Sequence, residues 1–163
     1  MIRYMERTRE YYGTLGYAPY AWAENSDSPF QVPQKKLAES RIGLITTAAP
    51  YQPELGDQGP GAAYNAAAKF FEVFTSATVP APDLRISHLS YDRKHSSAVD
   101  SNTWLPVARL QEAQQRGLFA ELAEEIIGVP TNRSQRATTE VDATAALEHC
   151  QRLAVDVALL VPT

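Results

Sequence analysis

The stretch Arg41-Ile42-Gly43-Leu44-Ile45-Thr46-Thr47-Ala48-Ala49 decides the fold. It is one short apolar run that ends in small residues, which is typical of a strand buried on both faces of a parallel sheet. The following residues, Tyr51 to Gly61, contain two prolines and three glycines, so we expect a long loop at the carboxyl end of this strand. In open α/β sheets, loops at that end hold ligands.

Other segments of the chain predict further strands and helices. Residues 84–89 alternate in the manner of a strand, and residues 155–161 form the most strand-like apolar run. Helices are predicted from Thr103 to Gly117, from Phe119 to Ile127 and from Thr144 to Leu153. Strands separated by helices predict an α/β fold with three layers, in which a mainly parallel sheet carries helices on both faces.

The first 39 residues differ in character from the rest. Residues 4–12 predict a short helix closed by Gly13, and an extended arm rich in Pro, Asn, Ser and Asp follows. The arm keeps aromatic residues by which it can pack on a neighbour, namely Tyr17, Tyr20, Trp22 and Phe30. We therefore expect an N-terminal helix and extended aromatic arm over residues 1–39 and an α/β core over residues 40–163, within a single domain of 163 residues.

Composition excludes several classes of function. The formal net charge is −4, without the clustered Lys and Arg that nucleic acid or anionic membrane would require, so small molecules or proteins are the expected partners. Cys150 is the only cysteine, which excludes an internal disulfide and fits a reducing compartment. The first ten residues carry alternating charges, and no run approaches the roughly 18 apolar residues of a membrane span. We expect a cytoplasmic protein.

Three blocks of sequence carry a resemblance to a known family. The most specific is Ser87-His88-Leu89-Ser90-Tyr91-Asp92 together with Asn102-Thr103-Trp104-Leu105-Pro106-Val107-Ala108-Arg109-Leu110. The other two are residues 41–49 and 154–162, and residues 130–136 are similar to a variant in short reductase-like members. Together these regions resemble the selenoprotein B family of the glycine, betaine, sarcosine and D-proline reductases over most of the chain.

The resemblance implies an oxidoreductase, or a subunit of one, that binds a small amino-acid-like substrate on the loops after the parallel strands. Its reaction would be a thiol- or selenol-dependent reductive cleavage of a carbon–nitrogen bond. The implied catalytic residues, which would orient and protonate the substrate, are His88, Tyr91 and Asp92. The expected substrate-binding residues are Thr46, Thr47, Asn102 and Arg109.

The chain departs from the family at the redox centre. In the family the last strand delivers a selenocysteine or cysteine, and here Val161-Pro162-Thr163 stand at that place. We therefore expect the thiol or selenol to come from a downstream segment or a partner protein, no cofactor of the chain's own, and a homo- or hetero-oligomer. The alternative is a non-catalytic ligand-binding or assembly subunit that has lost the redox motif.

The residues themselves leave structural roles open. His88 and Asp92 can tie their loop to backbone amides, Asn102 can cap the helix that follows it, and Arg109 can form a surface ion pair. Cys150, on a predicted apolar helix, is read as a small hydrophobic residue.

Two other kinds of site are disfavoured by spacing. A metal site would combine His88, Asp92, His95 and Asp100, but their spacing matches no standard metal motif, so none is predicted. The glycines between residues 56 and 61 do not form a dinucleotide fingerprint, so no nicotinamide or flavin site is predicted.

Overall fold

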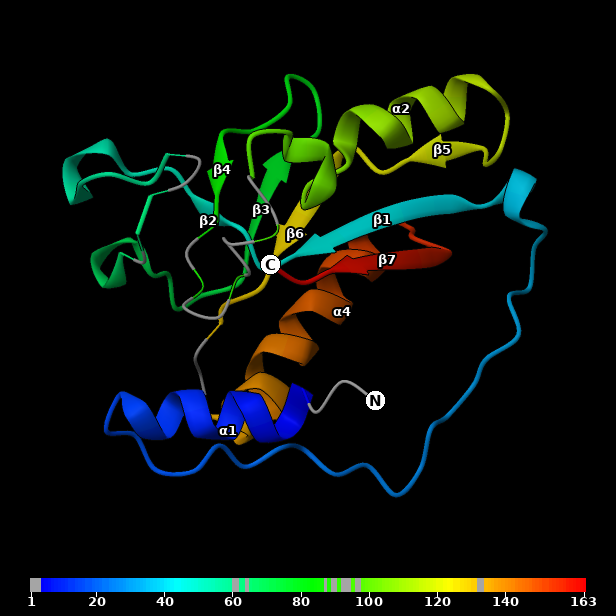
Figure 1. Ribbon diagram of the computed structural model, residues 1–163. Helices are drawn as coiled ribbons and strands as arrows, with labels where there is room; N and C mark the ends of the chain where they lie inside the picture. The colour runs from blue at the N-terminus through cyan, green and yellow to red at the C-terminus, as the bar shows by residue number, and fades with distance from the viewer. Residues whose placement is uncertain are drawn as a thin grey trace. The chain divides into compact units, whose positions relative to one another are not determined.

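The computed structural model describes residues 4–59, 62–63, 65–86, 88, 91, 95, 98–131 and 134–163. Contacts divide the chain into two compact units, Met1–Gln31 and Val32–Thr163 (Figure 1). The division expected from the sequence, after residue 39, falls a few residues later, at the end of a short 3-10 turn named η1 (Leu37–Glu39).

The N-terminal unit is a helix onto which the following chain folds back. Helix α1 (Tyr4–Thr14) presents Tyr12 to the arm. The Tyr12 ring lies with its centroid 5.9 Å from that of Tyr17 and 5.3 Å from that of Tyr20, and Tyr20 packs edge-on against Trp22 at 4.8 Å. Such ring pairs add to the stabilisation from area burial, so the aromatic residues of the arm hold it to the helix of its own unit.

The second unit contains a five-stranded, mostly parallel sheet (Figure 1). In spatial order, four of the strands are β3 (Phe74–Ala77), β6 (Glu125–Gly128), β1 (Arg41–Thr46) and β7 (Val157–Val161). The fifth, β5 (Glu121–Leu122), pairs with the start of β1 on the same side as β6. Only β3 runs antiparallel to its neighbour. A separate antiparallel pair joins β2 (Ala49–Pro50) to β4 (Leu84–Arg85).

Helices connect these strands. The chain passes through α2 (Val107–Gln115) before β5, and through a continuous helical stretch before β7. That stretch consists of α3 (Gln135–Ala137), the π-helix η5 (Thr138–Asp142) and α4 (Ala143–Arg152). Short 3-10 turns lie at η2 (Pro53–Leu55), η3 (Ala66–Ala68) and η4 (Ser101–Thr103).

Neighbouring residues of β1 pack in different clusters because successive side chains of a strand point to opposite faces. Leu44 is fully buried in a cluster with Trp104 and Val107, which lie just before and at the start of α2. Ile45 packs instead with Ala146 of α4. The middle of the central strand therefore carries apolar side chains on both faces.

An ionic network joins the amino ends of β1 and β7. The Asp156 carboxylate accepts from the backbone N–H of Arg41 at 2.9 Å and from Lys35 Nζ at 2.8 Å. The Arg41 guanidinium in turn pairs with Glu121 at 2.6 Å and Glu124 at 3.1 Å. These contacts fix the register of β1 against both neighbouring strands.

The sequence predicted several elements and missed others. The strand at residues 41–49, the strand at residues 155–161 and the helix at residues 144–153 are confirmed as β1, β7 and α4. The helix predicted from Phe119 to Ile127 is wrong, because this segment forms β5 and β6 between β1 and β3. Ile126 and Ile127 are both fully buried and pack in different clusters, as neighbouring residues of a strand covered on both faces do.

Two boundaries also differ from the predictions. Among the described residues of the strand expected at residues 84–89, Leu84 and Arg85 form β4, which pairs with β2 outside the main sheet. The helix expected from Thr103 starts at Val107, after the separate turn η4. In the part of the chain that the structure describes, no helix is both long and apolar enough to cross a membrane.

Candidate functional site

The carboxyl ends of β1 and β6 lie side by side, and the chain leaves them toward different helices. From β1 the chain passes through β2, β3 and β4 before it reaches α2, whose first residue packs in the Leu44 cluster. From β6 it continues through α3 and η5 into α4, whose Ala146 belongs to the cluster against which Ile45 packs. Ligands of open α/β sheets bind where neighbouring connections diverge in this way. Two cavities lie around this edge of the sheet.

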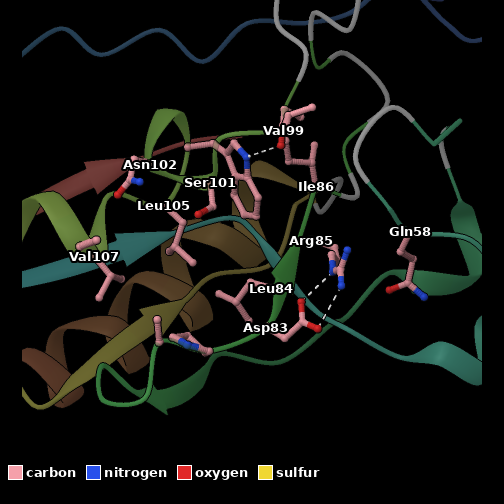
Figure 2. A pocket seen from close by; sticks show the side chains of 15 residues that line it. Gln58, Asp83, Leu84, Arg85, Ile86, Val99, Ser101, Asn102, Leu105 and Val107 are labelled. Atoms are coloured by element: carbon pink, nitrogen blue, oxygen red, sulfur yellow. Dashed lines mark hydrogen bonds and ion pairs between the residues drawn. The ribbon is translucent and has the colours of Figure 1, made fainter.

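The first cavity, here named the β4 cavity, has a volume of about 310 Å³. Residues from β4, from η4 and from the start of α2 line it, and Figure 2 shows them around one space. Its apolar wall contains Leu84, Ile86, Trp104 and Leu105. The polar residues on its lining are Gln58, Asp83, Arg85, Ser101 and Asn102.

An ion pair forms the charged wall of the β4 cavity. Arg85 Nε lies 2.7 Å from Asp83 Oδ1, and Arg85 Nη2 lies 3.0 Å from Asp83 Oδ2. The guanidinium carbon also stands 4.3 Å from the centre of the Tyr51 ring. The hydrogen bond to Asp83 raises the pKa of Arg85, which keeps the guanidinium charged. A positive and a negative group are thus presented together on one wall (Figure 2).

A loop clamped by side-chain amides forms another part of the wall. Gln58 is buried and donates through Nε2 to the carbonyl oxygens of Gln52 at 2.7 Å and Gly56 at 3.3 Å. Asn65 Nδ2 donates to the carbonyl oxygen of Leu55 at 2.8 Å. Because these side-chain amides donate to the backbone of residues 52–58, the loop has a defined shape despite its glycines and prolines.

The turn before α2 brings Asn102 and Trp104 to the same cavity. Asp100 Oδ1 accepts from the backbone N–H and from Nδ2 of Asn102, both at 2.9 Å, and these bonds lower the pKa of Asp100. Asp100 is therefore the cap of η4, and Asn102 lies inside that turn and lines the cavity. The Trp104 indole donates to the Ala98 carbonyl at 3.3 Å, which fixes its ring on the wall.

The predicted catalytic residues follow β4 directly. Tyr91 packs against the cluster that contains Trp104 and Leu84, two residues of the β4 cavity wall, and His88 is half-buried. Asp92 lies outside the described residues. Asp83, Arg85 and Gln58 were not predicted as site residues. The alternation Asp83-Leu84-Arg85, with opposite charges two residues apart on a strand, is the signal that could have found the ion pair.

Three predicted substrate-binding residues lie elsewhere. Thr46 is buried and its Oγ1 accepts from the Ala48 N–H at 3.1 Å, while Thr47 Oγ1 accepts from the Thr163 N–H at 2.7 Å. Both threonines line a second cavity, beside α4. Arg109 pairs with Glu112 at 2.8 Å on the exposed side of α2. Of the four residues, the described lining of the β4 cavity contains only Asn102.

Cys150 is poorly suited to act as a nucleophile. It is half-buried in the cluster of Ala146 and Ile127, and this burial raises the pKa of its thiol. The thiolate is the reactive form, so a raised pKa lowers the fraction available at neutral pH. The surroundings agree with a small hydrophobic role.

Comparisons with known proteins identify no relative. No protein-family model matches the chain, and neither a curated protein nor a solved structure does. Among the described residues, no group of three or more His, Cys, Asp and Glu side chains is placed to hold a metal ion.

Proposed function

We propose that this chain is an oxidoreductase, or a subunit of one, of the glycine/betaine/sarcosine/D-proline reductase type, and that it binds an amino-acid-like ligand in the β4 cavity. The observation that carries this proposal is the Asp83–Arg85 ion pair on the wall of a cavity of about 310 Å³. A zwitterion offers one carboxylate and one ammonium, the complement of that pair. The sequence resemblance supports the same class of substrate.

The chemistry of the ion pair favours a zwitterion over a simple ion. Arg85 uses Nε and Nη2 for Asp83, so Nη1 can donate to a ligand carboxylate. Asp83 can accept from an ammonium, and Asn102 and the Trp104 ring lie on the same lining. A zwitterion keeps both charges compensated, whereas a lone carboxylate or amine competes for one member of the pair and leaves the other without compensation.

In this proposal the electrons come from another thiol or selenol. Reductive cleavage of the carbon–nitrogen bond of an ammonium group needs two electrons and one proton; the amine leaves as a neutral molecule and the proton goes to the carbon. Because burial raises the pKa of Cys150, we assign the reductant to a partner protein or to a further segment. His88, Tyr91 and Asp92 remain the proposed groups that orient and protonate the substrate, since His88 and Tyr91 follow the strand that carries Arg85.

Ligand titration tests the proposal. Isothermal titration with glycine, sarcosine, betaine and D-proline should give saturable binding by at least one of them, and acetate or methylammonium should bind about tenfold more weakly or worse. Arg85→Gln should weaken the zwitterion by a similar factor, while Arg116→Gln, an exposed arginine at the end of α2, should not. Equal binding by the zwitterion and acetate, or by the two variants, would contradict the proposal.

The alternative function is a non-catalytic binding or assembly subunit. It is favoured by the N-terminal unit, which exposes Tyr17 and Leu15 beside its cluster of tilted aromatic rings, as surfaces that bind partner proteins do. Ammonia or amine release, measured with the bound zwitterion, a dithiol reductant and a candidate partner, separates the two functions. Loss of release in His88→Ala supports catalysis. Unchanged oligomeric state after removal of residues 1–31 would exclude assembly through this unit.

The proposal also includes the layers of the fold, the oligomer and the location of the protein. We infer three layers, with helices on both faces of the sheet, because Leu44 packs with the start of α2 and Ile45 with α4. The aromatic arm is then a surface for a second protein, in a homo- or hetero-oligomer. A cytoplasmic location fits a chain whose single cysteine sits as a thiol.

A further inference from the structure

The second cavity, here named the α4 cavity, is larger and chemically different from the first. It has a volume of about 490 Å³ and lies between α4 and the carboxyl halves of β1 and β7. Its lining contains mostly apolar side chains, among them Ile45, Val129, Ala146, Leu147 and Leu160. Cavities of about 300–1,000 Å³ with apolar walls and few polar groups are typical sites for small molecules.

One carboxylate occurs on this apolar lining. Asp142 is 1% exposed and is the sole acidic residue among the described residues of the wall. A buried carboxylate is stabilised by hydrogen bonds and positive charge rather than by apolar neighbours. Asp142 already has an interaction partner within the protein. A carboxylate has about four acceptor positions, so it can serve a ligand as well.

The backbone around Asp142 has an unusual form. Asp142 is the last residue of η5, a π-helix that interrupts the path from α3 to α4, and Thr138 at the other end of η5 also lines the cavity. π-Helical turns are rare and occur frequently at functional sites. At the open side of the cavity Leu147 and Leu160 are 56% and 68% exposed, so the apolar wall continues to the surface.

We propose that the α4 cavity binds a small aliphatic ligand that carries an ammonium group. The alkyl part contacts Ile45, Leu147 and Leu160, and the ammonium lies at Asp142 near the Thr138 hydroxyl. Charge complementarity selects the cation, since an alkyl carboxylate would meet Asp142 with like charge. This proposal rests on a different cavity from the proposed function and stands independently of it.

Binding of n-hexylammonium, n-hexanoate and methylammonium to the full chain tests the proposal, by calorimetry and by ¹⁵N chemical shifts. We expect saturable binding of hexylammonium. Hexanoate should bind at least about tenfold more weakly because its charge is negative, and methylammonium should bind at least about tenfold more weakly because it lacks the alkyl contacts. The shifted amides should include those of Ala143 and Ala146. No saturable binding, or equal binding of hexylammonium and hexanoate, would overturn the proposal.

Two variants locate the site. Ala143 is exposed and lines the cavity, so Ala143→Phe should fill it and reduce hexylammonium binding at least about fivefold. Thr144→Phe is the matched control, because Thr144 is the next exposed residue of α4 and does not belong to the described lining. Asp142→Asn should remove the preference for the cation. If Asp142→Asn does not fold, the comparison of Ala143→Phe with Thr144→Phe still tests the location of the site. Equal hexylammonium binding by those two variants would refute the assignment of the ligand to the α4 cavity.

Discussion

Substitution of Gly128 by alanine should destabilise the core, because the ring of Phe74 occupies the place of a side chain there. Gly128 and Phe74 face each other in the pairing of β6 with β3. A Cβ at Gly128 would lie 1.9 Å and 2.2 Å from two ring carbons of Phe74, far inside van der Waals contact. The ring would have to move, and it packs against Phe70 at 5.2 Å between centroids and against the Leu44 cluster.

The size of the effect follows from two opposed contributions. Overpacking of a core costs about 1–3 kcal/mol, and the entropy lost by the unfolded chain on replacing Gly with Ala offsets about 0.4–1 kcal/mol. The difference ranges from about 0 to about 2.6 kcal/mol, and we expect Gly128→Ala to lower the free energy of unfolding by about 1.3 kcal/mol, its midpoint. Urea unfolding followed by circular dichroism measures this, provided that the slope with urea stays unchanged.

Two further variants make the test specific. Gly59→Ala is the matched control in the same unit. Among the described atoms its Cβ would meet only a side-chain oxygen of Asp57 at 3.3 Å, and the substitution should change stability by less than about 0.5 kcal/mol. In a Phe74→Leu background the effect of Gly128→Ala should shrink, because the clashing ring is gone. Equal effects of Gly128→Ala and Gly59→Ala would refute the register of β3 against β6.

Two other predictions concern ionisable groups. The backbone N–H of Arg41 and the Lys35 ammonium lower the pKa of Asp156. The contribution of Asp156 to stability is therefore present above the unfolded pKa of about 3.9 and is lost as the pH falls through the lower folded pKa. Tm measured from about pH 6 to pH 2 should fall less steeply in Asp156→Asn than in the wild type. An identical pH dependence in the two proteins would contradict this role. Burial raises the pKa of Cys150, so its reaction with a disulfide reagent at neutral pH should be slower than that of a free thiol and should accelerate in urea. A reaction rate in the native protein equal to that in the unfolded chain would show the thiol to be exposed.

β1, β7 and α4 were predictable from sequence because their local patterns agree with their places in the fold. β1 is an apolar run largely buried in the parallel sheet, β7 is an apolar run paired with it, and α4 has apolar residues at helical spacing. Residues 119–127 failed because the pattern Leu-Phe-Ala-Glu-Leu-Ala-Glu-Glu-Ile-Ile, starting at Leu118, has helical spacing. The sheet overrides that preference by burying Ile126 and Ile127 on both faces.

The site was only partly predictable because it depends on contacts between distant segments. Asn102, predicted because it stands before a helix, lies on the lining of the β4 cavity. Asp83 and Arg85 come to that lining only when β4 pairs with β2, and Tyr51 then lies beneath the guanidinium. Thr46 and Thr47 were placed correctly at the carboxyl end of β1. Their cavity could not be foreseen, since it depends on where α4 crosses the sheet.

The described linings of the two cavities share no residue, so binding of the two proposed ligands can be tested separately. The lining of the β4 cavity includes Trp104 and Val107 of the Leu44 cluster, and that of the α4 cavity includes Ile45 and Ala146. Substitutions in independent sites leave each other's free energies unchanged. Arg85→Gln should therefore leave hexylammonium binding intact, and Ala143→Phe should leave zwitterion binding intact. If either variant affected both ligands, the coupling would have to pass through β1, and the two cavities would be parts of one functional site that spans the carboxyl edge of the sheet.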